Sequence, residues 1–166
     1  MLNDKVLKAL NDQINAELFS SYFYLAMEAY LHDRQLTGCA TWMRAQAAEE
    51  LTHAMKIYDY VVKSGGRIIL EKIDRPEHTW ESPLHCFEAT LEHEQYVTSL
   101  ISALVEVAIK EGDDATKNML DWFVSEQEEE EESVGEVLEK FKHAGNDTAA
   151  LAALDAELGK RSVEVG

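Results

Sequence analysis

The sequence predicts an all-α fold: a four-helix bundle with one long crossover between the second and third helices, and a short fifth helix at the C-terminal end. Two observations predict it. Apolar residues recur every three or four positions along most of the chain, and no alternating pattern of useful length predicts a strand. The two prolines, Pro76 and Pro83, fall in one region, so that helices can run without interruption elsewhere.

The first two helices are predicted over residues 3–32 and 38–64. A short turn over residues 33–36 separates them, with Thr37 as the expected N-cap of the second helix. The second helix is expected to end at the glycine pair that begins with Gly65. A connection this short predicts that the two helices form an antiparallel hairpin.

The remaining helices are predicted over residues 83–111, 114–143 and 147–158. Ser82 and Pro83 supply an N-cap and a first helical residue for the third helix. A turn at Gly112 joins the third and fourth helices, which predicts a second antiparallel hairpin. Gly145 and Asn146 end the fourth helix before the short fifth one.

The segment from Gly66 to Ser82 is too long to be an ordinary loop inside a compact domain. A helix of about 27 residues is about 40 Å long, and about 17 extended residues reach roughly 56 Å. The segment can therefore run the full length of the bundle, so that the two hairpins are joined by a long crossover.

The composition predicts one domain over residues 1–166, with 46% hydrophobic residues. The net charge of -17 argues against nucleic acid as a partner, because phosphate binding requires clustered Lys and Arg. The amphipathic, charged N-terminal stretch predicts neither a signal peptide nor a membrane segment, so we expect a cytoplasmic protein. Cys39 and Cys86 form no C-x-x-C pair, and both are expected to be free thiols.

A run of acidic residues, SEQEEEEES, spans residues 125–133 in the fourth predicted helix. Such a run is usually a solvated face or a disordered tail. At about 100° per residue, however, Gln127 and Glu130 fall in the apolar stripe of this helix, whereas Glu128 and Glu132 point to the opposite side. The apolar members of that stripe are Phe123, Val134, Val137 and Phe141.

The other three long helices carry the same kind of anomaly. Glu17 lies in the apolar stripe of the first helix, and Glu94 lies in that of the third. In the second helix Glu50 lies in the stripe, and His53 follows one turn later beside it. A single glutamate in a stripe can reflect a misjudged register, but four helices that agree indicate a common cause.

These polar residues lie near the middle of each predicted helix, so they predict one polar layer inside an apolar core. An unpaired buried carboxylate is neutralised or costs several kcal/mol, and four together require cations. Two divalent ions would supply that charge. Carboxylate oxygens with a single imidazole suit iron or manganese better than zinc.

Other candidate residues receive plainer interpretations. His93, beside Glu94, lies off the stripe and is expected at the surface or behind a metal ligand. The methionines expected to fill the core rather than to bind haem are Met27, Met43, Met55 and Met119. Tyr24 shares a face with Glu17 and is either a packing residue or a redox-active neighbour of the metals.

From Asp4 to about Leu158, the sequence resembles the prokaryotic (bacterial and archaeal) non-haem ferritins. Four separated stretches match the ligand pattern of this family in order and in spacing. The stretches are LNDQINAELFSSYFYLAM, TWMRAQAAEELTHAMKIYDYV, LEHEQYVTSLI and WFVSEQEEEEES. The resemblance implies the ferritin-like form of the bundle predicted above.

The resemblance also implies a dinuclear iron site with two iron ions per chain. Glu17 and His53 would hold one iron ion. Glu94 and Glu130 would hold the other, and Glu50 would bridge the two. Tyr24 would be the catalytic tyrosine beside this centre, and Gln127 an outer-sphere or weakly associated ligand. A third iron site would lie next to it, formed by Glu49, Glu126, Glu129 and the shared Glu130.

Related bundles differ at one position of the pattern. Bacterioferritins and rubrerythrins carry a second E-x-x-H in the last long helix, where this chain has Gln127 and Glu130. Rubrerythrins usually add a C-x-x-C iron module, which this sequence lacks. These departures favour a non-haem ferritin, and we expect no haem.

By this resemblance the protein would be an iron-storage ferroxidase. It would oxidise iron(II) with dioxygen or hydrogen peroxide and deposit a ferric mineral inside a hollow homo-oligomeric shell of 24 chains. Two other classes stay open at this stage: a dinuclear peroxidase or oxidase that does not store metal, and a structural bundle in which the polar layer sets the packing register.

Overall fold

The computed structural model describes residues 1–162 and contains five α-helices. The helices are α1 (Asp4–Asp33), α2 (Thr37–Lys63), α3 (Pro83–Lys110), α4 (Asp114–Ala144) and α5 (Thr148–Leu158). No strand occurs in the described part of the chain, which confirms the predicted all-α fold. Every predicted helix end lies within one residue of the observed end.

Side chains cap four of the five helix N-termini. Asn3, Ser82, Asp113 and Asp147 each accept a hydrogen bond from a backbone N–H in the first turn that follows. The prediction that Thr37 caps α2 was wrong, because α2 begins at Thr37 and the capping position belongs to Leu36. Asp155 of α5 supplies the missing acceptor instead: its Oδ1 lies 2.8 Å from the Cys39 nitrogen.

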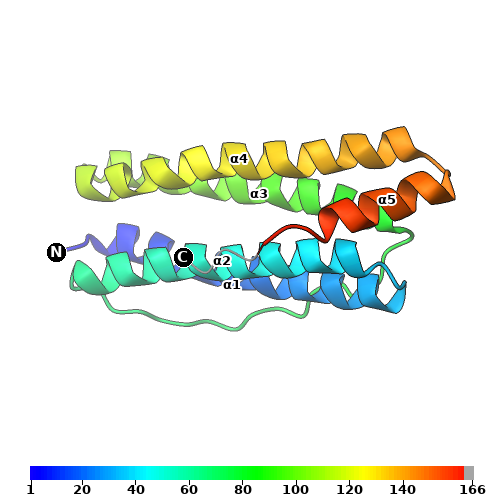
Figure 1. The fold of residues 1–166 in the computed structure, drawn as a ribbon. Helices are drawn as coiled ribbons and strands as arrows, with labels where there is room; N and C mark the ends of the chain where they lie inside the picture. The colour runs from blue at the N-terminus through cyan, green and yellow to red at the C-terminus, as the bar shows by residue number, and fades with distance from the viewer. Residues whose placement is uncertain (163–166) are drawn as a thin grey trace.

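The helices form two antiparallel hairpins that pack face to face (Figure 1). One hairpin is α1 with α2 and the other is α3 with α4, and α1 also packs against α3. The short α5 turns back at the end of α4 and contacts both α2 and α4. None of the helices in residues 1–162 is long and apolar enough to cross a membrane.

The crossover between Lys63 and Pro83 runs along the outside of the first hairpin as extended chain (Figure 1). Two asparagines of α1 fasten it. The Asn11 amide donates to the Arg67 carbonyl at 3.1 Å, and its oxygen accepts from the Ile69 nitrogen at 2.8 Å. Asn15 donates to two carbonyls further along the same segment. The crossover therefore spans the bundle as predicted.

The core consists of two apolar clusters separated along the bundle. One contains Tyr24, Met43, Phe87 and Val134, and the other contains Ile14, Ile57, Ile101 and Phe123. The stripes predicted from periodicity are buried or half-buried throughout. Buried carboxylates interrupt the stripe of each long helix between the two clusters, at Glu17, Glu50, Glu94 and Glu130.

Candidate metal centre

Helix α2 contributes a carboxylate and an imidazole to the centre, and this imidazole is the only one in the centre among the described residues. Glu50 and His53 are one helical turn apart, and both are buried on the face that looks into the bundle. Residues three apart on a helix are neighbours on its surface. The His53 Nδ1 atom accordingly lies 3.2 Å from Glu50 Oε2.

Glu17 of α1 joins these two residues in a first group of three possible metal ligands. One ligand atom from each of Glu17, Glu50 and His53 lies within 4.8 Å of the others. Glu17 Oε1 accepts a hydrogen bond of 2.9 Å from Gln13, one turn earlier. The other oxygen of Glu17 is buried and has no hydrogen-bond partner among the described residues, so it is free to bind a cation.

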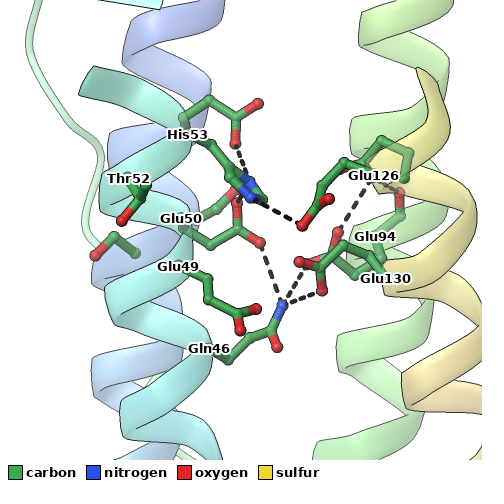
Figure 2. Close-up of polar contacts among 12 residues, drawn as sticks. Gln46, Glu49, Glu50, Thr52, His53, Glu94, Glu126 and Glu130 are labelled. Carbon is green, nitrogen blue, oxygen red and sulfur yellow. Dashed lines mark hydrogen bonds and ion pairs between the residues drawn. The ribbon is translucent and has the colours of Figure 1, made fainter. Parts of the chain in front are cut away.

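A second group consists of Glu50, Glu94 and Glu130, which α2, α3 and α4 bring together at the same level. Glu50 belongs to both groups and therefore lies where a bridging ligand would lie. Tyr24 donates a hydrogen bond of 2.5 Å to Glu94 Oε1, and the Gln127 amide donates to Glu94 Oε2 at 3.2 Å. Figure 2 shows the Glu94 and Glu130 carboxylates facing Glu50 across the bundle.

A third group lies beside the first two and shares a residue with each. His53 Nε2 lies 3.5 Å from Glu126 Oε1, and these two residues group with Glu130. Of the other predicted third-site residues, Glu129 is exposed and Glu49 is half-buried. Neither joins a group of possible ligands among residues 1–162, so their role as ligands stays a prediction.

Burial and mutual repulsion make this cluster costly to ionise. Burial raises the pKa of Glu17, and burial together with the neighbouring charge of Glu94 raises the pKa values of Glu50 and Glu130 well above their ordinary 4.5. The pKa of Tyr24 is also raised well above its ordinary 10.0, first by burial and then by the charge of Glu94. The binding of protons or of cations therefore stabilises the site.

The donor set fits iron. Four buried carboxylates and one imidazole offer oxygen and nitrogen ligands with no sulfur, and both cysteines lie elsewhere in the core. Such a set suits iron or manganese, which accept carboxylate and imidazole ligands with open coordination positions. Because two groups of three ligands share Glu50, the arrangement can hold two metal ions close together.

Two polar residues in or beside the centre were not predicted from the sequence. Gln46 is fully buried and donates hydrogen bonds to carboxylates of the second group. It lies one turn before Glu50 and two turns before His53 on the same face, which is the signal that could have found it. Arg161, beyond α5, pairs with Glu49 at 2.9 Å, and no periodicity points to it.

His93 lies behind the centre rather than in it. Its Nε2 is 2.8 Å from the Ser20 hydroxyl, and its ring packs edge-on against Tyr24 with centroids 5.8 Å apart. Burial lowers the pKa of His93. This half-buried position agrees with the expectation of a residue behind the metal ligands.

Comparisons with known proteins agree with the fold. The protein-family model of the ferritin-like domain matches residues 7–144 of this chain. A "Bacterial non-heme ferritin" of Bacteroides fragilis is 41% identical over 97% of this chain and 100% of its own length. A protein of the same name from Staphylococcus haemolyticus is 38% identical over 99% of both chains.

A solved structure gives the same result. A closed form of the Archaeoglobus fulgidus ferritin, obtained by site-directed mutagenesis, superposes with a TM-score of 0.98 at 47% sequence identity, and the match covers 99% of this chain and 100% of that one. The resemblance to prokaryotic non-haem ferritins that the ligand pattern predicted is thereby confirmed. This chain belongs to the ferritin family.

Proposed function

We propose that the protein is an iron-storage ferroxidase, which oxidises iron(II) at the dinuclear centre and passes the product to a ferric mineral. The observation that carries this proposal is the pair of ligand groups that share Glu50. Glu17, Glu50 and His53 form one group and Glu50, Glu94 and Glu130 form the other, all on rigid helices and all buried. Membership of the ferritin family supports the same activity.

Iron(II) is the substrate of the proposed reaction. Each iron(II) ion gives up one electron, so a pair supplies the two electrons that reduce dioxygen to the level of hydrogen peroxide, or hydrogen peroxide to water. Carboxylates are hard oxygen donors and stabilise iron(III) relative to iron(II), which makes the oxidation favourable. Glu50 would keep both ions within reach of one oxidant molecule.

The surrounding groups prepare the centre for this substrate. Tyr24 and Gln127 each donate a hydrogen bond to a different oxygen of Glu94, which fixes the plane of that carboxylate. The raised pKa values of Glu50 and Glu130 mean that binding of iron(II) displaces protons. Tyr24 remains our candidate for a catalytic residue, because its hydroxyl contacts a predicted iron ligand.

The finer features of the proposal are those that the resemblance to non-haem ferritins implies. Glu49, Glu126, Glu129 and the shared Glu130 would form the third iron position, which would accept iron next to the dinuclear centre. The partners would be iron(II), dioxygen or hydrogen peroxide, and further copies of this chain in a hollow shell of 24 in the cytoplasm, without haem. The charge of -17 would help to concentrate cations within such a shell.

The test is the initial rate of iron(II) oxidation in a Glu50→Gln variant, followed by stopped-flow absorbance. Glutamine keeps the size of the side chain but cannot bridge two metal ions as a carboxylate does. The expected result is loss of the rapid phase, with assembly unchanged. Glu128→Gln is the matched control, because Glu128 is an exposed glutamate of α4 that faces away from the centre. A wild-type rate in the Glu50 variant would contradict the site assignment.

A further inference from the structure

Gln46 is a polar side chain buried among the acidic residues of the metal centre. It lies on α2, is fully buried, and points into the bundle from the position one turn before Glu50. Figure 2 shows its side-chain nitrogen at the meeting point of three dashed contacts from two sides of the bundle. A buried amide is costly unless it is hydrogen-bonded, so its contacts indicate what it does there.

The Gln46 amide nitrogen contacts every carboxylate of the second ligand group. It lies 2.5 Å from Glu130 Oε2, and 3.4 Å from both Glu50 Oε1 and Glu94 Oε1. These three glutamates are the ones whose ligand atoms gather for a second metal ion. By contrast, no hydrogen bond joins Gln46 to Glu17 or His53 among residues 1–162.

Glu130 depends on this contact more than its neighbours do. Glu94 also receives hydrogen bonds from Tyr24 and Gln127, so three donors hold it in place. For the Glu130 carboxylate, Gln46 is the one hydrogen-bond donor within the described part of the chain. Because a carboxylate has two oxygens, the oxygen of Glu130 that Gln46 does not hold stays available to a metal ion.

The oxygen of the Gln46 amide has no hydrogen-bond partner among residues 1–162, although it is buried. An unpaired buried acceptor lowers stability, and such a group calls for an explanation. The explanation here is that the amide is placed for its nitrogen: the N–H groups serve the carboxylates, and the oxygen is left without a donor. Gln46 therefore supplies donors to the carboxylates of the centre, and its unpaired oxygen lowers the local stability.

We infer that Gln46 is a positioning residue for the second metal position. It holds the Glu130 carboxylate beside Glu94 and Glu50 before the metal arrives, and it thereby sets the affinity of that position separately from the position formed by Glu17, Glu50 and His53. This inference rests on the proposed dinuclear centre. It concerns the binding of metal and not the electron transfer that follows.

The test is a titration of the metal-free protein with cobalt(II), a divalent ion that is not oxidised under these conditions. Calorimetry gives the affinity of each binding step, and visible absorption reports the ligand set of each bound ion. In Gln46→Leu the first step should keep its wild-type affinity, whereas the second should weaken by about ten- to a hundredfold, as is typical when a residue that orients a metal ligand is removed.

Gln13→Leu is the matched control. Gln13 is also a buried glutamine, but it donates to Glu17 of the first ligand group. This variant should leave the second step at its wild-type affinity. If Gln46→Leu does not fold, as judged by circular dichroism, Gln46→Met removes the same amide with an unbranched side chain of similar length, and the same outcome is expected.

The outcomes separate the two proposals. If the wild-type protein fails to bind two cobalt(II) ions per chain, the dinuclear centre itself is wrong. If the wild-type protein binds two ions and the Gln46 variants bind both with unchanged affinity, the centre stands and the role of Gln46 is overturned. Equal weakening of both steps would also overturn it, because that result means a general loss of structure.

Discussion

The Tyr24 hydroxyl lies 2.5 Å from Glu94 Oε1, and both side chains are completely buried at the centre of the bundle. The two residues come from α1 and α3, so this hydrogen bond joins the two hairpins at the level of the predicted iron ligands. It also orients Glu94, the one carboxylate of the second ligand group that belongs to no other group among the described residues. The Tyr24 hydroxyl therefore joins the two hairpins and holds one carboxylate of the predicted metal centre in place.

Replacing Tyr24 by Phe keeps the ring in the core and removes this hydroxyl. The metal-free variant should lose about 1 to 3 kcal/mol of stability, because a buried carboxylate loses one of its donors. Initial iron(II) oxidation should slow by about tenfold, as a ligand loses its orienting partner. Denaturant unfolding and stopped-flow absorbance measure the two effects. Tyr96→Phe is the control, since Tyr96 is exposed, and equal behaviour of the two variants would refute the role of the Tyr24 hydroxyl.

We expect Arg161 to compete with metal for Glu49. Its guanidinium donates to Glu49 Oε2 at 2.9 Å and lies over the ring of Trp42. In Arg161→Gln the affinity of the predicted third position for cobalt(II) should rise about two- to fivefold, the modest size expected for a partly exposed ion pair. A calorimetric titration that resolves the third step measures this.

The control for Arg161 is a second arginine that forms an ion pair with a glutamate. Arg44 pairs with Glu28 at 2.7 Å, away from the predicted ligands, so Arg44→Gln should leave the third step unchanged. A third step that is unchanged or weaker in Arg161→Gln would show that Glu49 does not bind metal at this position.

The stability of the metal-free protein should fall as the pH rises above about 4.5. The pKa values of Glu17, Glu50 and Glu130 are raised in the folded state, chiefly by burial. Above the ordinary pKa of 4.5 the unfolded chain has released these protons while the folded chain still holds them. The folded state therefore binds more protons, and its stability is lost as the pH rises toward the raised pKa values.

Thermal unfolding between pH 5 and 8 tests this prediction. Glu50→Gln should show a shallower fall than the wild-type protein, because one of the carboxyl groups with a raised pKa is gone. Iron(II) or cobalt(II) should restore the stability at neutral pH. A metal-free protein that gains stability across this range would contradict the assignment of raised pKa values to the cluster.

Gly38 allows α5 to dock against the start of α2. A Cβ atom added there would lie 1.7 Å from the Asp155 carbonyl oxygen, a distance that only separation of α5 from the start of α2 could relieve. Gly38→Ala should therefore lower the free energy of unfolding by about 1 to 3 kcal/mol, and it should disturb the cap that Asp155 gives to α2.

Gly135 is the matched control for Gly38. It lies inside α4, and a Cβ atom added there would meet nothing within 4 Å. Gly135→Ala should raise stability by about 0.5 to 1 kcal/mol, because alanine loses less conformational freedom in a helix. Denaturant unfolding compares the two variants, and a stabilising Gly38→Ala would show that α5 is not tightly docked.

The fold could be predicted closely because local signals decide it. Ser82 marks a helix end through its side-chain cap, whereas Pro83 and Gly112 do so through their own backbone preferences. These ends were found within one residue. The error at Thr37 has a different origin. The start of α2 is capped by Asp155, more than 100 residues later, and no local pattern reveals such a tertiary contact.

The centre was predictable to the extent that it follows helical periodicity. Glu17, Glu50, Glu94 and Glu130 lie in apolar stripes at matching depth, and the structure places all four in overlapping groups. The contacts of Gln46 and Arg161 were not predictable in this way. Periodicity gives the face of a helix, but not the side-chain rotamer that turns an amide toward Glu130.

The most direct test of the storage proposal is aerobic loading of the purified protein with iron(II), followed by size-exclusion chromatography and iron analysis of the protein peak. We expect iron far beyond about three ions per chain, the number that the predicted ligands can hold, carried by a large shell. Iron that stops at about two or three ions per chain in a small particle would contradict storage, and would indicate a dinuclear enzyme instead.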